Sequence, residues 1–350
     1  MTVCPSRLEP VFFHRIWGAH RLAPLFPDVS DPANPIGEAW MTSLDSRFAG
    51  GPWEGKTLGE AWRAMPPAWT GTRVAHDGAF PILVKFIFPE DKLSVQVHPH
   101  DEYARLHEQA AGGLGKTEMW YVVAAREGSE VCVGLKPGVG PADFRHAIAD
   151  GSAENCIERF PVRAGEAIFV PPGTVHTIGP GSILCEIQEY SDLTYRVYDY
   201  HRVGADGRPR EMHLEKAMDV INFGVQGGGK ISPAKSRRGA VEETHFAVCR
   251  YFATEKWEFC ERVAATSSPE HFDMLIFLEG SGRMAWPGGA SEYSPAQVWF
   301  IPAALGDYEI LPAARTSLLR TFVPPDLKAL TRELAARGIA EASLSRLVHS

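Results

Sequence analysis

The sequence predicts an all-β fold, a barrel or sandwich of short strands with a few short helices at its periphery. Its apolar runs are brief, and 27 prolines and 33 glycines are spread along the 350 residues. Helical spacing of apolar residues occurs in only a few places. Many short strands between Gly/Pro turns are typical of β-barrels and sandwiches.

Six apolar runs have the length and composition of strands. In chain order they cover residues 80–88, 93–98, 119–124, 167–170, 183–200 and 246–252. The β pattern is therefore predicted on both sides of residue 223.

Four segments predict helices. Thr57 and Glu60 form the pattern of a capping box, which would open a short helix through Met65. Residues 101–109, 213–222 and 327–336 also carry helical spacing. These helices are too few to form a bundle, so we expect them to decorate the β core.

A Gly-, Ser- and Lys/Arg-rich stretch, residues 223–239, lacks apolar periodicity and predicts a linker or mobile loop. It would divide an N-terminal catalytic domain, residues 1–222, from a degenerate C-terminal domain with a helical tail, residues 240–350.

A weak internal repeat spans this stretch. Residues 168–176 align with 299–307, and the run from Glu118 aligns with the run from Asp273. The second copy has Asp307 in place of His176 and lacks the Gln-x-His pair, so we expect it to be structural.

Bulk composition excludes several functional classes. A net charge of −8 disfavours binding to nucleic acid or to an anionic membrane. No apolar run approaches the roughly 18 residues that span a bilayer, and no secretory signal is visible. The six cysteines are scattered without a C-x-x-C pair, which favours free thiols in a reducing cytoplasm.

A candidate metal site begins in residues 93–100. Strand alternation places Ser94, Gln96 and His98 on one face and two valines on the other. Buried imidazole and amide groups need partners, and a metal ion provides one. Glu118 starts another strand and His176 follows a Pro-Pro-Gly turn. These four residues suit zinc with an open coordination position, although Mn²⁺ or Fe²⁺ also accepts two histidines and a carboxylate.

Several segments in this order resemble the signature blocks of the type I phosphomannose isomerases. They cover roughly residues 12 to 220 and are 37–40, 80–86, 93–99, 115–121, 134–138, 172–179, 186–188 and 194–200. The resemblance implies two cupin (jelly-roll) β-barrels, one zinc ion, and the interconversion of mannose 6-phosphate and fructose 6-phosphate. With 58 positions between Glu118 and His176, the chain resembles the short form of the family.

The resemblance also implies roles for individual residues. The metal ligands would be Gln96, His98, Glu118 and His176, the set reached above. Arg196 would be the catalytic arginine and Glu186 an active-site carboxylate, with Lys116 and Lys136 lining the pocket. Arg202 matches a further family position. His201 and residues 41–55 depart from the family pattern, which bears on the exact substrate.

An aldose–ketose isomerisation through a cis-enediol needs a Lewis acid, a base and cations for the phosphate. We expect Glu186, or a solvent molecule on the zinc, to be the base, and Arg196 to stabilise the enediolate or donate a proton. For the phosphate we expect Ser94 and Lys116, with Lys136 or Arg202. Lys85 lies in an apolar run and could pair internally.

Alternatives from other classes remain: a cupin oxygenase with iron in the same ligands, or a cupin that binds or acts on another sugar phosphate. A P-loop at residues 115–117 is rejected because the first glycine of that motif is replaced by Ala110 and a strand follows. The expected partner is a small phosphosugar, and the chain would be a monomer or homodimer.

Overall fold

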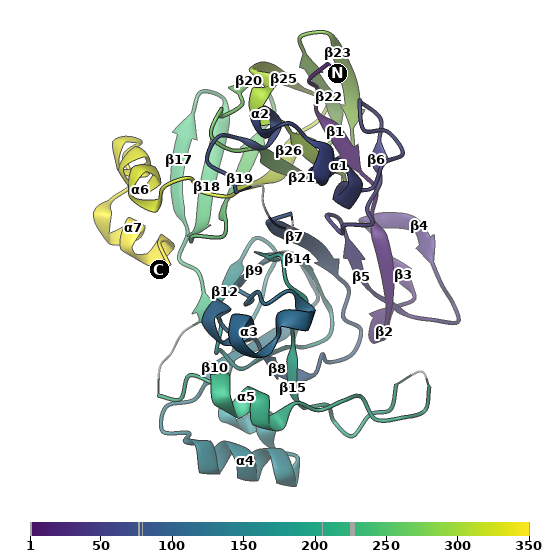
Figure 1. The fold of residues 1–350 in the computed structure, drawn as a ribbon, viewed down its shortest axis with the longest axis vertical. Helices are drawn as coiled ribbons and strands as arrows, with labels where there is room; N and C mark the ends of the chain where they lie inside the picture. The colour runs from purple at the N-terminus through teal and green to yellow at the C-terminus, as the bar shows by residue number, and fades with distance from the viewer. Residues whose placement is uncertain (1, 76–77, 79, 205, 225–227, 350) are drawn as a thin grey trace.

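The computed structural model describes residues 2–75, 78, 80–204, 206–224 and 228–349. It is mostly β, as the sequence predicts, with four main antiparallel sheets in two pairs (Figure 1). The N-terminal pair is called the first unit below and the C-terminal pair the second unit. The strand pairing of the described residues keeps the sheets of each pair separate, so each unit consists of two facing sheets.

The first unit contains a seven-stranded and a five-stranded sheet. The larger has the order β16 (Gly229–Lys230), β12 (Ala167–Val170), β9 (Glu118–Ala125), β14 (Ser182–Glu189), β7 (Ile82–Ile87), β5 (Ile36–Trp40), β2 (Val11–Ala19). The smaller has the order β11 (Ile157–Pro161), β10 (Glu130–Leu135), β13 (His176–Ile178), β8 (Val95–Val97), β15 (Tyr195–Tyr198). Trp120 and Val122 of one sheet share a core cluster with Val133 and Ile178 of the other, so the two sheets face each other.

The second unit repeats this plan with an eight-stranded and a four-stranded sheet. The larger has the order β17 (Ala234–Arg238), β18 (Val241–Val248), β19 (Ala253–Phe259), β26 (Thr316–Phe322), β21 (Asp273–Glu279), β24 (Val298–Ile301), β1 (Ser6–Leu8), β6 (Phe48–Ala49). The smaller has the order β20 (Val263–Thr266), β25 (Asp307–Pro312), β22 (Gly282–Trp286), β23 (Gly289–Tyr293). A small hairpin joins β3 (Arg21–Leu22) and β4 (Phe26–Ser30) beside the first unit.

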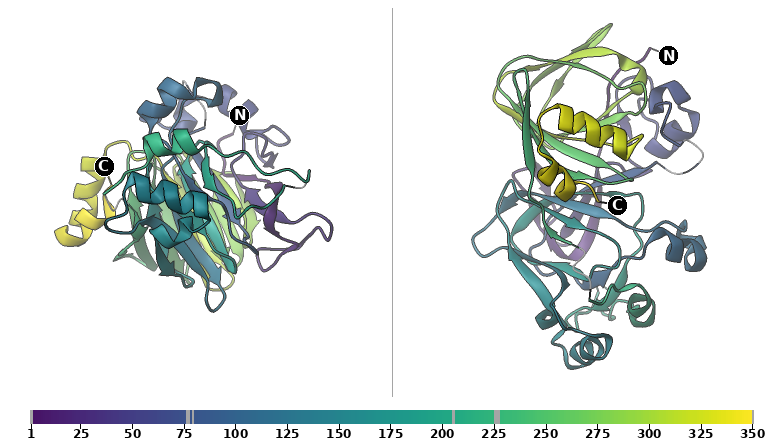
Figure 2. Two further views of the ribbon diagram at one scale, coloured as in Figure 1. Left: turned by 90° about the horizontal axis from the view of Figure 1, so that it is seen from below. Right: turned by 90° about the vertical axis from the view of Figure 1, so that its left-hand side faces the viewer.

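The two large sheets pack back to back. Their outward faces share one apolar cluster, in which Phe86 and Met119 of the first unit join Met274 and Phe300 of the second. The chain is thus a stack of four sheet layers, and Figure 2 shows the units one above the other. This shared core is apolar on both sides. The large sheet of each unit therefore buries one face against the other large sheet and its opposite face against its own small sheet.

Helices lie at the periphery, as predicted. They are α1 (Leu58–Ala64), α2 (Pro67–Thr70), α3 (Asp101–His107), α4 (Pro141–Asp150), α5 (Leu214–Val220), α6 (Leu327–Ala336) and α7 (Glu341–Leu347), with 3₁₀ turns η1 (Gln109–Ala111), η2 (Ala153–Cys156) and η3 (Ala303–Leu305). The capping box of α1 is confirmed, because the Thr57 and Glu60 side chains each accept a hydrogen bond from the other's backbone N–H. Helices α2, α4 and α7 were not expected; α4 starts with a proline in a Gly/Pro-rich stretch that reads as turns.

The predicted linker, residues 223–239, contains two strands. Its part described after residue 227 forms β16 on the first unit and β17 on the second. Pairing with neighbouring strands satisfies the backbone N–H and C=O groups of this polar stretch. Such pairing leaves no apolar periodicity in the sequence, so the strands could not be predicted. Likewise β1 and β6 join the second unit's sheet, although residues 1–222 were expected to form the N-terminal domain.

The internal repeat corresponds to real strands. Residues 168–176 run from β12 into β13, and 299–307 run from β24 into β25. Among the described residues, none of the helices has the length and apolar character that crossing a bilayer requires. All six cysteines are free thiols, as expected.

Candidate active site

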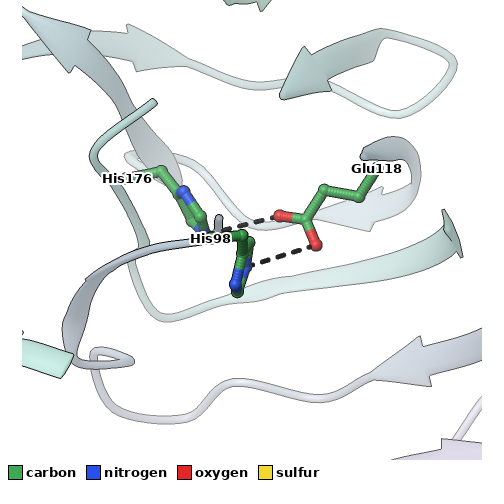
Figure 3. A group of neighbouring side chains, drawn as sticks. All are labelled: His98, Glu118 and His176. Carbon is green, nitrogen blue, oxygen red and sulfur yellow. Dashed lines mark ion pairs between the residues drawn. The ribbon is translucent and has the colours of Figure 1, made fainter. Parts of the chain in front are cut away.

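The predicted metal ligands meet inside the first unit. One ligand atom from each of His98, Glu118 and His176 lies within 4.8 Å of the other two, and the three side chains are buried (Figure 3). His98 Nε2 lies 3.6 Å from Glu118 Oε2, and His176 Nε2 lies 3.3 Å from Glu118 Oε1. Residues 78 positions apart thus converge on one point.

Strand register explains this convergence. Gln96 and His176 lie directly opposite each other on β8 and β13, and Glu118 lies opposite Val170 at the start of β9. Val95 and Val97 point to the other side of β8 and pack in one cluster with Ala217 of α5. The predicted alternation of this strand is therefore confirmed.

A tight turn positions His176. Gly173 has φ +79°, and a Cβ there would lie 2.4 Å from the side-chain nitrogen of Asn222. Only glycine fits this close approach without strain. The turn leaves Thr174 O free to accept a hydrogen bond from His176 Nδ1 at 2.9 Å.

Hydrogen bonds fix the tautomer of both histidines. His98 Nδ1 donates to Leu193 O at 2.8 Å, as His176 Nδ1 does to Thr174 O. A carbonyl only accepts, so Nδ1 carries the proton and Nε2 presents a lone pair to the cluster. Such carbonyl partners are what hold metal-binding histidines in place.

The centre of the cluster has polar atoms without hydrogen bonds. His98 Nε2 and Glu118 Oε1 are buried and make no hydrogen bond with any described residue, while Glu118 Oε2 pairs with Lys116 Nζ at 3.0 Å. Buried polar groups almost always find a partner, and a cation held by two imidazoles and a carboxylate satisfies both unpartnered atoms. Gln96 Nε2 lies 3.2 Å from His176 Nε2, and a half-turn of its amide presents the oxygen to the same point. The residues therefore fit a zinc-type metal ion.

Protonation states also fit a metal. Burial, with the nearby Lys116 charge, lowers the pKa of His98 to about 3, and burial lowers the pKa of His176. Both rings are therefore neutral near pH 7. Burial alone would raise the pKa of Glu118, but the Lys116 ammonium and the His98 and His176 side chains together outweigh it and hold the pKa well below its usual value. Neutral imidazoles and an ionised carboxylate are the forms that bind metals.

A cavity of about 390 Å³ opens beside this cluster and is rich in charge. The predicted residues Ser94, Gln96, Lys116, Glu186 and Arg196 all line it. Its volume is at the small end of the range for ligand pockets.

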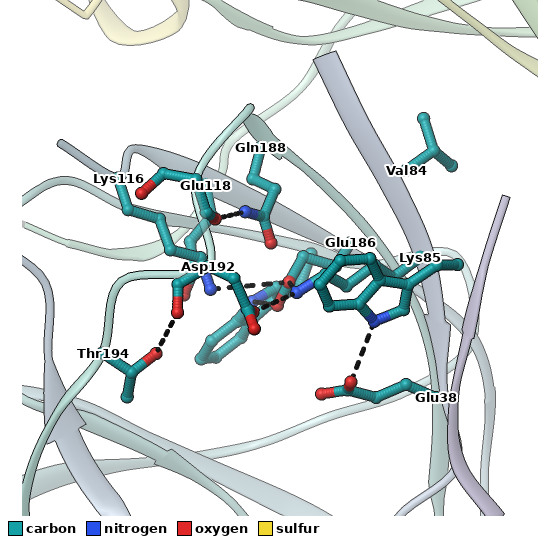
Figure 4. A network of polar contacts seen from close by, with 12 residues as sticks. Glu38, Val84, Lys85, Lys116, Glu118, Glu186, Gln188, Asp192 and Thr194 are labelled. Atoms are coloured by element: carbon teal, nitrogen blue, oxygen red, sulfur yellow. Dashed lines mark hydrogen bonds and ion pairs between the residues drawn. The ribbon is translucent and has the colours of Figure 1, made fainter. Parts of the chain in front are cut away.

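The carboxylate Glu186 lies at the centre of a buried ion network (Figure 4). Its Oε1 lies 3.6 Å from Lys85 Nζ and 3.7 Å from Lys116 Nζ, and its Oε2 accepts a hydrogen bond from Trp120 Nε1 at 3.0 Å. Burial raises the pKa of Glu186 although the two lysines lower it. A carboxyl with a raised pKa beside a substrate-sized cavity is suited to proton transfer.

Lys116 bridges this network to the metal cluster. Its Nζ lies 3.0 Å from Glu118 Oε2. Burial would lower its pKa, but Glu118 and Glu186 raise it, so the ammonium stays charged.

Arg196 is the cation of the cavity without a carboxylate partner among the described residues. Its Nε donates to Ser94 Oγ at 3.2 Å and its Nη1 to Glu211 O at 2.8 Å. Burial, together with the neighbouring Arg210, lowers its pKa. An uncommitted guanidinium beside Arg210 favours an anion at this end of the cavity.

Two predicted residues do not line the cavity. Lys136 is exposed in the turn after β10. Arg202 pairs with Asp91 at 2.9 Å and Asp199 at 2.8 Å. Its guanidinium is thus committed to carboxylates outside the pocket. Neither side chain lines the cavity, and a role for them in substrate binding stays a prediction.

Other lining residues escaped the sequence analysis: Arg15, Glu38, Asp192 and Arg210. Lys85 pairs internally, as suspected, with its Nζ 3.0 Å from Asp192 Oδ1. A lone lysine in the wholly buried strand β7 was the available signal, since a buried charge requires a partner. Nothing comparable marks Arg15 or Arg210 in the sequence.

Comparison with known proteins places the chain among isomerases of sugar phosphates. Residues 6–121 match the family model of the phosphomannose isomerase type I catalytic domain. A probable mannose-6-phosphate isomerase of Bacillus subtilis is 36% identical over 312 residues, covering 87% of this chain and 96% of that relative.

Solved structures agree. The mannose 6-phosphate isomerase from Bacillus subtilis has a TM-score of 0.82 at 31% identity, covering 91% of this chain and 99% of the other. A mannose 6-phosphate isomerase bound with zinc and yttrium has a TM-score of 0.69 at 17% identity, with 91% and 99% covered. The last likeness concerns the fold alone.

Proposed function

Because the chain belongs to the type I phosphomannose isomerase family, we propose that it interconverts mannose 6-phosphate and fructose 6-phosphate, using one zinc ion held by Gln96, His98, Glu118 and His176. The observation that carries this proposal is the buried cluster of His98, Glu118 and His176, in which His98 Nε2 and Glu118 Oε1 have no hydrogen bond, set beside a cavity whose Arg196 pairs with no carboxylate among the described residues. Zinc when bound supplies a Lewis acid that polarises the substrate carbonyl.

Glu186 is the group that we assign to proton transfer. In the forward direction its carboxylate takes the proton from C2 of open-chain mannose 6-phosphate while O1 gains a proton, which gives a cis-enediol. The carboxyl then returns the proton to C1 while the hydroxyl at C2 loses its proton, which gives the ketone of fructose 6-phosphate. The pKa raised by burial suits both halves of this transfer, because the carboxyl must accept the proton and release it again. Trp120 and the two lysines hold the carboxylate in place.

Cations around Glu186 divide the remaining work. Lys116 is enclosed by two carboxylates, so we place it beside the reacting carbons, where it stabilises negative charge on the substrate oxygens. Arg196 has no such partner among the residues described, and with Ser94 it meets the anionic substrate. These cations also distinguish the site from that of an oxygenase, which has no need of an anion-binding end.

A coupled assay tests the proposal. Metal-reconstituted protein is given mannose 6-phosphate, and fructose 6-phosphate formation is followed beside a chelated sample and His176→Ala. Turnover that requires both the metal and His176 is the expected result. Bound zinc without turnover would move the function to another aldose phosphate or to binding alone, and absence of bound metal would remove the proposed site.

A further inference from the structure

The second unit contains a cavity of about 470 Å³, larger than the active-site cavity. Residues of β19, β21, β26 and α6 line it, and Figure 2 (right) shows α6 in front of the sheets of the second unit. The residues that line it are far from the metal cluster in sequence and belong to a different pair of sheets.

Strand register makes this cavity the counterpart of the active site. Glu118 begins β9 opposite Val170, the last residue of β12, and Asp273 begins β21 opposite Ile301, the last residue of β24. Two residues further along, Trp120 pairs with Glu186 and Leu275 pairs with Arg320. Asp273 thus takes the place of Glu118, and Arg320 takes the place of Glu186.

The surrounding ion pairs match as well. Glu186 lies opposite Lys85, and Arg320 lies opposite Glu255, so the second unit has the same pair with its charges exchanged. At the rim of each cavity, Arg15 lies 2.7 Å from Glu38, and Arg238 lies 2.7 Å from Glu243.

The metal ligands have no equivalents here. The pair formed by Gln96 and His176 becomes Ala265 and Tyr308. Tyr308 is buried while Asp307 is exposed, so the loop before β25 is one residue longer than the sequence alignment assumed. Within the described ranges, the group formed by His98, Glu118 and His176 is the only candidate metal cluster.

Charge pairing distinguishes the two cavities. In the second, Arg238, Arg320 and Arg337 each lie within 3.2 Å of a carboxylate. The lining includes these three arginines and five carboxylates: Glu255, Glu270, Asp273, Asp326 and Glu333. A phosphate only accepts hydrogen bonds and would face this surplus of negative charge, whereas Arg196 in the first cavity is uncommitted.

Paired arginines and carboxylates offer alternating donors and acceptors. A hydroxyl group both donates and accepts, so a polyol satisfies such a lining without disturbing its charge balance. Trp257, Tyr308 and Phe322 add aromatic carbon to the wall, as is usual in pockets for small molecules.

We propose that the cavity between the second unit and α6 is a metal-free binding site for a neutral polyhydroxylated ligand, an unphosphorylated sugar of hexose size. In this proposal the second unit binds an uncharged sugar, while the first unit acts on a phosphorylated sugar.

Saturation-transfer NMR titrations of the full chain with D-mannose and D-fructose test this site. Ala329→Trp places an indole in the cavity from α6, at a residue exposed to it. We expect the dissociation constant to rise at least about tenfold, equivalent to about 1.4 kcal/mol of binding free energy. Ala264→Trp repeats the test from β20, should the first variant not fold. Ala335→Trp, also exposed on α6 but outside the cavity lining, is the matched control and keeps wild-type binding.

Arg196→Ala separates the two cavities. Sugar binding that survives Arg196→Ala and is lost in Ala329→Trp supports the proposal. Binding lost in Arg196→Ala but kept in Ala329→Trp places the sugar in the active site and overturns it. The proposal also fails when neither sugar binds at millimolar concentration, or when inorganic phosphate is the ligand that Ala329→Trp expels.

Discussion

The two units have matching frameworks but use their buried charges differently. In the first, lysines surround Glu186 and the imidazoles of His98 and His176 approach Glu118. In the second, Arg320 lies between Glu255 and Asp273 at 2.9 Å and 3.0 Å, and no metal cluster is formed by the described residues. The same strand positions therefore serve chemistry in one unit and a paired ion network in the other.

This difference shows what the fold supplies and what the side chains supply. Register places a charged residue at the same three positions in both units. Only in the first does the set include groups whose pKa is shifted toward reactivity, such as Glu186 with its raised pKa. Buried polar groups held without a partner and with a shifted pKa mark the reactive site of the first unit, whereas the paired charges of the second unit neutralise one another.

The largest expected effect is on catalysis. Glu186→Gln removes the proposed proton carrier while keeping its shape, so kcat falls by about 10²–10⁴-fold. Exchange of the C2 proton of mannose 6-phosphate with solvent, followed by NMR with zinc content checked, measures the loss. Glu189→Gln is the control on the same strand: burial raises the pKa of Glu189 to about 8, so its carboxyl is largely neutral at pH 7 and the amide changes little. Normal exchange in Glu186→Gln would remove Glu186 from the reaction.

In the second unit the equivalent position should affect stability instead. Arg320→Met leaves Glu255 and Asp273 buried without their cation, which costs about 3–5 kcal/mol of unfolding free energy. Urea unfolding measures this cost, and kcat per folded molecule stays at the wild-type value. Arg315→Met, at an exposed arginine that pairs with Glu258, should change stability by no more than about 0.5 kcal/mol. A variant as stable as the wild type would contradict a structural role for Arg320.

A pH dependence should follow from the same network. Burial would raise the pKa of Glu255, but His245 and Arg320 outweigh it and lower the pKa below the usual 4.5. The folded form therefore binds this proton less readily than the unfolded form, so its stabilisation is present above about pH 4.5 and is lost as the pH falls further. Each such carboxyl contributes a slope of up to about 1.4 kcal/mol per pH unit.

Urea unfolding between pH 6 and pH 3 measures that slope. Glu255→Gln should flatten it, because the amide binds no proton. Equal slopes in the variant and the wild type would show that Glu255 is not held ionised by its neighbours.

The smallest expected effect concerns the apolar core that the two large sheets share. Thr57→Ala removes the N-cap of α1, whose Leu58 and Trp62 pack in the cluster between the large sheets. The free energy of unfolding should fall by about 1 kcal/mol, with reduced protection in both units and an unchanged KM for the substrate. Hydrogen exchange of α1 and of the adjoining sheets measures it. Destabilisation confined to one unit would show that the shared core does not couple the stability of the two units.

Much of the candidate active site in the first unit was predictable from the sequence. The alternation of Ser94, Gln96 and His98 with apolar neighbours predicted an inward polar face. The strand start at Glu118 and the turn before His176 predicted the remaining metal ligands, and the resemblance supplied Arg196. Lys136 and Arg202 lie outside the cavity lining, because position near a strand end does not give the direction of a long side chain. Arg15 and Arg210 come from distant segments, and their approach depends on the closing of the sheets.

The relation between the units was only partly predictable. The repeat identified the equivalence of Glu118 and Asp273, which register supports. It paired His176 with Asp307 because one extra residue in the loop before β25 is invisible to a short ungapped match. The structure places Tyr308 inward instead. A one-residue shift exchanges the faces of a strand, so such details need the observed register.

The number of zinc ions per chain tests most directly whether only the first unit binds a metal. Elemental analysis of zinc-reconstituted wild type, His176→Ala and Asp273→Asn compares the two equivalent sites. One ion per chain, lost in His176→Ala and retained in Asp273→Asn, is the predicted result. Two ions in the wild type, or zinc lost from Asp273→Asn and kept in His176→Ala, would contradict it.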